Sequence, residues 1–151
     1  NKHKTTTTMK TLRIYATMMM LAIAGMWMTA SAQVLRDATN DNTVGRISSN
    51  GIVRDAALHS VGTFDADGTV RNALGTAVGK IVRLEIFDPA GTRVGYINTD
   101  GTVRDGNSVK LGHVNLSDGK VTDAQQRVLG YARGIRVDWI ACYYFFGFFK
   151  K

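Results

Sequence analysis

The chain has 151 residues, of which 21% are charged, and its formal net charge is +7. Much of that excess lies near the N-terminus: residues 1–32 hold four of the 19 basic residues and none of the 12 acidic ones, so the rest of the chain carries +3. So small a charge does not provide the basic face that neutralises several phosphates, and we expect no nucleic-acid partner. The single cysteine, Cys142, excludes an internal disulfide, and we expect it to be a small buried apolar residue.

The first part of the chain is typical of a targeting segment. Residues 1–8 (NKHKTTTT) precede the first methionine, and we interpret them as an upstream, non-native leader. Residues 9–32 have a short basic start, an apolar run and then the small residues Ala30 and Ala32 before Gln33, which is the layout of a signal peptide. An uncleaved anchor is the alternative, but the apolar run is shorter than the roughly 20 residues that a spanning helix needs. We therefore predict secretion across the inner membrane and a periplasmic or cell-surface location.

Residues 33–134 contain an internal repeat, marked by a Val-Gly or Leu-Gly pair every 16 to 18 residues. The glycines of these pairs are Gly45, Gly62, Gly79, Gly95, Gly112 and Gly130. A second series keeps the same spacing, with the apolar residues Leu35, Val53, Val70, Ile86, Val103 and Val121. Both series indicate a unit of about 17 residues. We divide the chain accordingly into a repeat domain, residues 33–134, and an apolar, aromatic C-terminal segment, residues 135–151.

Each unit is predicted to be a β-hairpin. Apolar residues alternate with polar ones after each glycine pair, and the turn signals SSNG, DADG, NTDG and LSDG follow. Three-residue turns ending at Gly51, Gly68 and Gly101 place apolar residues opposite each other in the pairs Ile47 with Val53, Phe64 with Val70, and Ile97 with Val103. Each second strand ends at an Asp or Asn whose side chain can bind the amides of the next turn. The unit around residues 81–86 (IVRLEI) lacks the Asp-Gly turn.

The predicted fold class is all-β, with tandem hairpins closed into a radial ring or barrel. An open meander leaves unpaired edges that invite aggregation. The chain offers half a hairpin at each end, VLRD at residues 34–37 and VLGYA at residues 128–132, and pairing these halves closes the ring. A β-solenoid with about 17 residues per coil is the alternative.

The segments VGYINTDGTVRDG (94–106) and LGHVNLSDGKVTD (111–123) lie between a signal-like leader and an aromatic tail. This combination resembles the five-fold β-flower proteins of Bacteroidetes, and the resemblance covers residue 34 to the C-terminus. It implies a radial arrangement of β-hairpins and secretion by a Gram-negative cell. It implies no activity and no catalytic residues.

The C-terminal segment is the most apolar part of the chain after residue 32. Residues 139–149 (WIACYYFFGFF) carry no charge and hold seven aromatic residues. We expect this segment to pack on or in the ring, because the aliphatic residues facing inward are too small to fill a central space. The alternative is an exposed patch on residues 139–149 that contacts a membrane surface or a protein partner, with Lys150 and Lys151 facing anionic headgroups.

Residue types suited to catalysis or metal binding are few. His59, in a loop, and His113, on a strand, have no equivalents in other units, and we expect them to be surface residues. Residues 37–42 (DATNDN) and 65–68 (DADG) have the composition of calcium loops but neither the spacing nor the final glutamate of an EF-hand. Turn chemistry accounts for these acidic clusters. We predict no catalytic residue, no cofactor and no metal.

Four arginines, Arg36, Arg54, Arg71 and Arg104, occupy equivalent positions in their units. A stripe that captures an anion is one interpretation. Because an acidic residue or Asn follows each arginine, we expect a solvated row of local ion pairs instead.

The predicted function is that of a secreted, non-enzymatic β-repeat protein with a structural or binding role. The alternative is a peripheral membrane protein anchored by its aromatic tail.

Overall fold

The computed structural model describes residues 33–150, so the predicted leader (1–8), the predicted signal peptide (9–32) and the last residue lie outside the described residues. Twelve strands and one helix follow each other along the chain. They are β1 (Gln33–Arg36), β2 (Thr43–Ile47), β3 (Ile52–Asp55), β4 (Ser60–Phe64), β5 (Thr69–Asn72), β6 (Ala77–Val82), β7 (Glu85–Phe87), β8 (Arg93–Ile97), β9 (Thr102–Asp105), β10 (Lys110–Val114), β11 (Lys120–Asp123), β12 (Val128–Tyr131) and α2 (Val137–Phe145).

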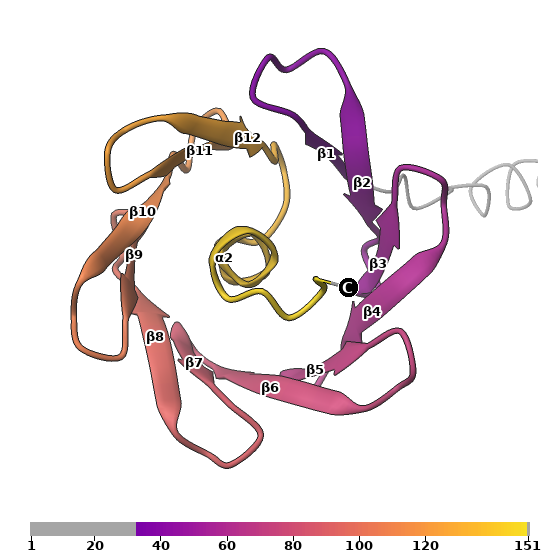
Figure 1. The fold of residues 1–151 in the computed structure, drawn as a ribbon, viewed down its shortest axis with the longest axis vertical. Helices are drawn as coiled ribbons and strands as arrows, with labels where there is room; N and C mark the ends of the chain where they lie inside the picture. The colour runs from indigo at the N-terminus through magenta and orange to yellow at the C-terminus, as the bar shows by residue number, and fades with distance from the viewer. Residues whose placement is uncertain (1–32, 151) are drawn as a thin grey trace, which may run out of the picture. The chain divides into compact units, whose positions relative to one another are not determined.

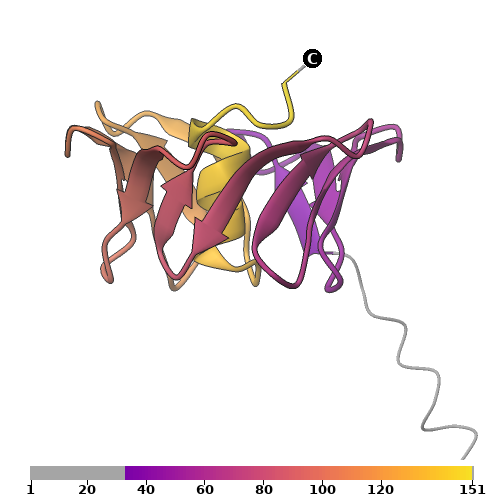
Figure 2. The same ribbon diagram turned by 90° about the horizontal axis from the view of Figure 1, so that it is seen from below.

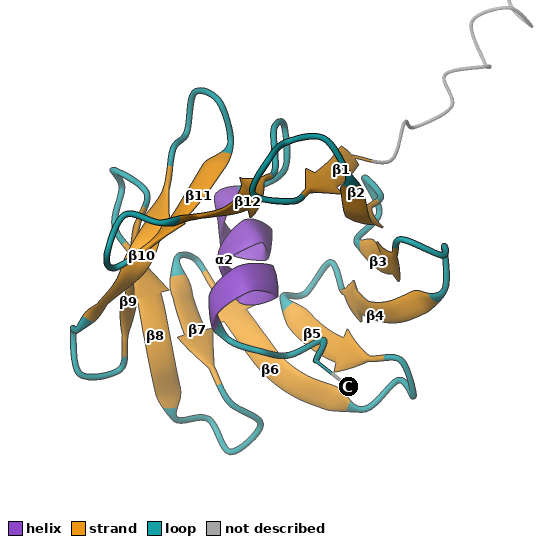
Figure 3. Cartoon of the chain, turned by 45° about the horizontal axis from the view of Figure 1, so that its top comes forward, coloured by secondary structure: helices purple, strands orange, loops and turns teal. Residues whose placement is uncertain are grey.

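The strands form a closed antiparallel barrel in which each strand pairs with its neighbours in the chain and β1 pairs with β12. Figure 1 and Figure 3 show this ring with α2 inside it. The predicted all-β barrel of hairpins is confirmed. The solenoid alternative is wrong, because adjacent strands run antiparallel and are joined by short turns.

The predicted hairpin registers are confirmed in the regular units. Ile47 lies opposite Val53, Phe64 opposite Val70 and Ile97 opposite Val103. The turn glycines have positive φ, as at Gly68, where φ is 91°. A Cβ on Gly68 would also lie 2.1 Å from the carbonyl oxygen of Ile81 in the next hairpin. Glycine is therefore required both by the turn and by the close approach of the neighbouring backbone.

The unit without Asp-Gly makes a tighter hairpin. Val82 lies opposite Glu85, so β6 and β7 are joined by the two residues Arg83 and Leu84. Arg83 supplies the positive φ of this turn, at 59°. The inward pair Ile81 and Ile86 stays in register, which explains how the barrel tolerates the irregular unit.

Loops that join an odd-numbered strand to the following even-numbered one all lie at one end of the barrel, which we call the loop end. Figure 2 shows these loops splayed outward at that end and the hairpin turns at the other, the turn end. The predicted Asp and Asn turns are present. For example, the Oδ1 atom of Asp105 accepts the amides of Asn107 and Val109, each at 2.9 Å. The same side-chain oxygen of Asn72 accepts the amides of Leu74 and Thr76 at 3.0 Å.

The core lies between the barrel wall and α2. The wall contributes one buried apolar side chain from each of β1 to β11, and Ala132 lies just after β12. The eleven are Leu35, Ile47, Val53, Phe64, Val70, Ile81, Ile86, Ile97, Val103, Val114 and Val121. From α2, Trp139 stacks on Phe64 with ring centroids 5.0 Å apart, and Ile140, Ala141 and Cys142 are buried. The expectation that the C-terminal segment packs in the ring is confirmed.

Sequence analysis did not assign a helix to the C-terminal segment. A closed barrel offers no free strand edge in its interior, so a chain there must satisfy its own backbone hydrogen bonds, and a helix does so. Asp138, in the first turn, has the charge that a helix N-terminus favours and forms an ion pair with Arg136 at 2.5 Å. The one helix of residues 33–150 is not long and apolar enough to cross a membrane.

The barrel closes at a seam between β1 and β12. Only one residue pair, Arg36 and Tyr131, is in register there, whereas the other strand pairs have three or four. Side chains reinforce the seam. The Gln33 amide donates to the carbonyl of Gly134, and the Tyr144 hydroxyl donates to the carbonyl of Arg36 at 3.3 Å. The C-terminal segment therefore helps to hold the two ends of the sheet together.

Candidate binding face at the loop end

The six repeat glycines form a collar on the inner wall of the barrel. A Cβ built on any of them would lie only 2.4 to 3.1 Å from a ring or hydroxyl atom of the C-terminal segment. The pairs are Gly45 with Tyr143, Gly62 with Phe149, Gly79 with Phe148, Gly95 with Phe146, Gly112 with Phe145, and Gly130 with Tyr144. The glycine of the repeat therefore makes room for an aromatic side chain, and each unit receives one.

The six aromatics, which we call the aromatic collar, contact the barrel in a regular order. From Tyr143 to Phe149 they meet glycines on β2, β12, β10, β8, β6 and β4 in turn, so each aromatic advances by one repeat around the ring. Gly147 is the only residue of this stretch without an aromatic side chain. Its φ of 68° turns the chain after α2 and keeps Phe148 and Phe149 on the ring.

All six side chains of the aromatic collar are half-buried. Two grooves, of about 350 and 420 Å³, are both lined by Val61, Phe149 and Lys150. Leu74, in the loop between β5 and β6, lines the first groove and is 90% exposed. The aromatic collar, Val61 and Leu74 form what we call the apolar face, the main candidate binding surface of the loop end.

Asp55, Tyr143 and Tyr144 line one of the grooves, and each has a shifted pKa that sets its charge at neutral pH. The amide of His59 donates to Asp55 at 2.9 Å, and a ring nitrogen of His59 lies 3.3 Å from the same carboxylate. Burial by itself raises the pKa of Asp55, but these contacts outweigh it and the pKa is lowered, so Asp55 is ionised. Burial also raises the pKa of Tyr143 and Tyr144, so both hydroxyls stay protonated at neutral pH.

His59 and His113, the two histidines of the described residues, lie in different parts of the barrel. His59 is in the loop after β3, whereas His113 is on β10, where its Nε2 atom is 3.0 Å from the carbonyl oxygen of Asp100. The acidic residues of the two candidate calcium loops accept hydrogen bonds from amides of their own turns. Asp37 accepts the amides of Thr39 and Asp41, and Asp67 accepts the amide of Thr69. Within residues 33–150 no group of three or more His, Cys, Asp or Glu side chains is arranged to hold a metal ion.

The expected row of ion pairs along the four arginines was largely wrong. Among these four arginines, within the described residues, only Arg71 makes an ion pair, and it does so with Asp65 at 2.7 Å rather than with the next residue. The Asp or Asn after each arginine is already bound to amides of its loop. The guanidinium groups instead donate to loop carbonyls: Arg71 to Gly75 at 3.0 Å, Arg104 to Ser108 at 2.9 Å and Arg36 to Asp41 at 3.4 Å.

Cys142 is fully buried in α2, as expected. Burial raises the pKa of its thiol far above the ordinary value, with a smaller contribution from Asp138. The thiol is therefore a packing group.

A family model described as 5-fold β-flower protein matches residues 32–149. The match includes the repeat region and the C-terminal segment, so the aromatic tail is part of the family's pattern. No curated protein and no solved structure matches the chain.

Proposed function

The chain belongs to the 5-fold β-flower family of repeat proteins, and from this premise we propose that it is a secreted, non-enzymatic protein that binds a partner protein through the apolar face at its loop end. Secretion rests on the signal-like sequence of residues 9–32, and an origin in Bacteroidetes rests on the resemblance described above. The binding role rests on the geometry of the loop end.

One observation carries the binding role: a large aliphatic side chain, Leu74, stands in solvent beside an apolar groove and is 90% exposed. Leu58, in the loop between β3 and β4 at the same end of the barrel, is 57% exposed. Leu58 also has a positive φ of 70°, a conformation that is costly for leucine and is filled by glycine in the equivalent loops at Gly75 and Gly91. Exposed apolar clusters and backbone strain of this kind are typical of interaction sites.

The charges of the loop end do not form the cationic surface that an anionic membrane attracts. Five of the six loops begin with an aspartate: Asp37, Asp55, Asp88, Asp105 and Asp123. Cations balance them in the same loops, because Arg127 pairs with Asp123 at 2.7 Å and the guanidinium groups of Arg71 and Arg104 lie on loop carbonyls. The aromatic tail is also engaged by the glycine collar, which leaves it poorly placed to insert into a bilayer as an anchor.

Site-specific photo-crosslinking in cells of the native host tests the binding face. A photoreactive phenylalanine analogue at Leu74 is expected to give a discrete adduct with a protein, whereas the same analogue at Leu116 is expected to give none. Leu116 is a matched control because it is 59% exposed but lies in the hairpin turn between β10 and β11, at the opposite end. Equal adducts from both positions, or none from Leu74, contradict the proposal.

Two further measurements separate the proposal from its alternative. Cell fractionation is expected to find the protein outside the cytoplasm, and a purely cytoplasmic location contradicts secretion. In flotation with anionic liposomes, the protein of residues 33–151 is expected to stay with the soluble fraction. Flotation that is lost on deleting residues 135–151, from a protein that stays folded, would instead support a peripheral membrane protein held by its tail.

A further inference from the structure

A groove on the outer wall follows the seam between β1 and β12. The two strands have a single residue pair in register, and beside it lies a groove of about 360 Å³, which we call the seam groove. Its lining residues are Val34, Arg36, Asn40, Asp118, Tyr131 and Arg133. Val34 and Arg36 flank the buried Leu35, and Tyr131 precedes the buried Ala132, so these side chains face outward. The seam groove shares no residue with the apolar face.

Two more arginines continue the outer wall beyond the seam groove. Arg46 on β2 lies in register with Val34 of β1 on one side and with Arg54 of β3 on the other. Arg46 and Arg54 are both half-buried. Side chains directly opposite each other on antiparallel strands have Cβ atoms about 5 Å apart, and like charges in such a pair are destabilising. An anion bound between the two guanidinium groups would relieve this repulsion.

Positive charge is concentrated along this part of the outer wall. Four arginines line or continue the seam groove, and Lys120 lies in register with Tyr131 on its other side. Within residues 33–150 none of these five cations makes an ion pair, whereas four arginines elsewhere do: Arg71, Arg93, Arg127 and Arg136. Arg36 donates to the carbonyl of Asp41 at 3.4 Å, which uses one of the five N–H groups of its guanidinium. The arginines of the seam therefore keep donors for an anionic ligand.

The other side chains of the seam groove suit a sugar. The Tyr131 ring provides a flat surface on which the apolar face of a sugar ring can pack, and the amide of Asn40 can both donate and accept hydrogen bonds. The Oδ1 atom of Asp118 accepts the amide of Lys120 at 2.9 Å, which leaves the second carboxylate oxygen to a ligand. A carboxylate at this place repels an acidic peptide but accepts a hydrogen bond from a sugar hydroxyl.

We propose that the seam groove binds an acidic oligosaccharide, with one sugar ring on Tyr131 and carboxylate or phosphate groups on the arginines. Arg36 and Arg133 bind the acidic group of the sugar in the groove, and Arg46 and Arg54 share the acidic group of a following sugar. From β12 to β3 there are three strand spacings, or about 14 Å, so a chain of sugars reaches both pairs of arginines and a single small ion does not. The proposal stands independently of the apolar face.

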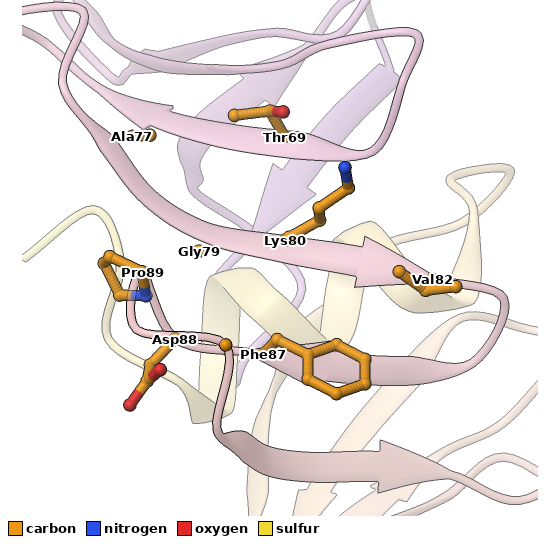
Figure 4. Close-up of a pocket in the computed structure, with 9 residues that line it drawn as sticks. Thr69, Ala77, Gly79, Lys80, Val82, Phe87, Asp88 and Pro89 are labelled. Atoms are coloured by element: carbon orange, nitrogen blue, oxygen red, sulfur yellow. The ribbon is translucent and has the colours of Figure 1, made fainter.

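A second groove on the outer wall, of about 350 Å³, provides the comparison. Lys80 and Phe87 face each other there, as Arg46 and Arg54 do beside the seam. Figure 4 shows the amine of Lys80 projecting toward β5, away from the Phe87 ring. Arg93, the neighbour of Phe87 on β8, is already in an ion pair. We therefore expect this second groove not to bind an acidic oligosaccharide, which makes Lys80 a matched control position.

The test is an NMR titration of the protein of residues 33–151 with trigalacturonate, which has three sugar rings and three carboxylates. We expect saturable shifts of the amides of residues 34–36 and 131–133. Maltotriose, a neutral saccharide of the same length, is expected to bind at least about ten-fold more weakly, because it lacks the charges that the arginines bind. Capped triglutamate, which has the carboxylates but no sugar ring, is expected to bind at least about five-fold more weakly.

Three outcomes of this titration overturn the proposal. Absence of saturable shifts with trigalacturonate excludes the ligand class, and equal affinity for maltotriose excludes a role for the arginines. Equal affinity for capped triglutamate excludes recognition of the sugar and would indicate an acidic segment of a protein as the ligand instead.

Variants that copy residues of other units locate the site. Arg46→Thr introduces the residue that β4 has at the equivalent position, Thr63, and Arg54→Thr introduces the residue that β11 has, Thr122. Each is expected to weaken binding of trigalacturonate at least about five-fold. Lys80→Thr removes the same charge at the equivalent position of β6 and is expected to leave binding unchanged. Unchanged binding in Arg46→Thr and Arg54→Thr, or an equal loss in Lys80→Thr, overturns the proposal.

Discussion

The six repeat glycines fit closely against the aromatic collar. We therefore predict that a methyl group added to one of these glycines lowers the free energy of unfolding, and that removing the facing ring restores much of it. In Gly79→Ala the new Cβ would lie 2.6 Å from Cζ of Phe148 and 3.0 Å from the carbonyl oxygen of Phe87. The ring must move by about 1 Å to reach ordinary contact, and overpacking of this kind costs about 1–3 kcal/mol. Phe148 is half-buried near the end of the chain, so we expect about 1–2 kcal/mol for Gly79→Ala.

Gly95 provides the comparison, because there the backbone is also in the way. A Cβ on Gly95 would lie 2.4 Å from two ring atoms of Phe146 and 2.6 Å from the carbonyl oxygen of Arg104. Movement of the ring relieves only the first contact. We therefore expect Gly95→Ala to cost about 2–3 kcal/mol, more than Gly79→Ala.

A double-mutant cycle measured by urea unfolding separates the two contributions. In a Phe148→Ala background, Gly79→Ala is expected to cost less than about 0.5 kcal/mol, because the remaining contact is the marginal one with Phe87. In a Phe146→Ala background, Gly95→Ala is expected to retain more than about 1 kcal/mol. A coupling below about 0.5 kcal/mol between positions 79 and 148 would refute the argument and would mean that the glycines serve the backbone alone.

Three other predictions concern the loops and the core. Leu58→Gly is expected to raise the free energy of unfolding by about 1 kcal/mol, because it removes the strain of a leucine at φ 70°, and thermal melting against the native protein checks this. Hydrogen bonds from the Asn42 and Thr39 side chains lower the pKa of Asp37 to about 2, so its contribution to stability is present above about pH 4 and is lost as the pH falls toward 2. Melting temperatures between pH 2 and 6 are expected to fall less steeply for Asp37→Asn than for the native protein, and equal slopes would contradict this role. Cys142 is expected to react with iodoacetamide only as fast as the protein unfolds, so a rate that does not change with urea would contradict its burial.

The fold was predictable from the sequence to the extent that hairpins are local. Turn glycines such as Gly68 and the apolar pairs beside them set the strand register within a few residues. The half-hairpins at the two ends of the repeat region indicated a closed ring, because their pairing leaves no strand edge exposed. The volume of the aromatic segment indicated where it belongs. These inferences use only the period of the chain and the size of its side chains.

Other features depend on contacts between distant residues. Val-Gly and Leu-Gly pairs indicated a repeat, but nothing local shows that Gly95 faces Phe146, which lies 51 positions away. The same is true of Arg104: the sequence predicts an ion pair with an acidic neighbour, but Asp105 binds an amide of its own loop and Arg104 donates to the carbonyl of Ser108.

The seam between β1 and β12 has a consequence for how the barrel opens. Every other strand pair forms between neighbours in the chain, whereas this one joins the two ends of the sheet and carries the largest entropic cost of loop closure. Tyr144 lies against Gly130 of β12 and donates to the carbonyl of Arg36 in β1, so the aromatic collar and both edge strands meet at one point. Separation of the edge strands must then release α2 as well. Amide hydrogens of β1, β12 and α2 are accordingly expected to exchange as one cooperative unit, ahead of the ten strands between them.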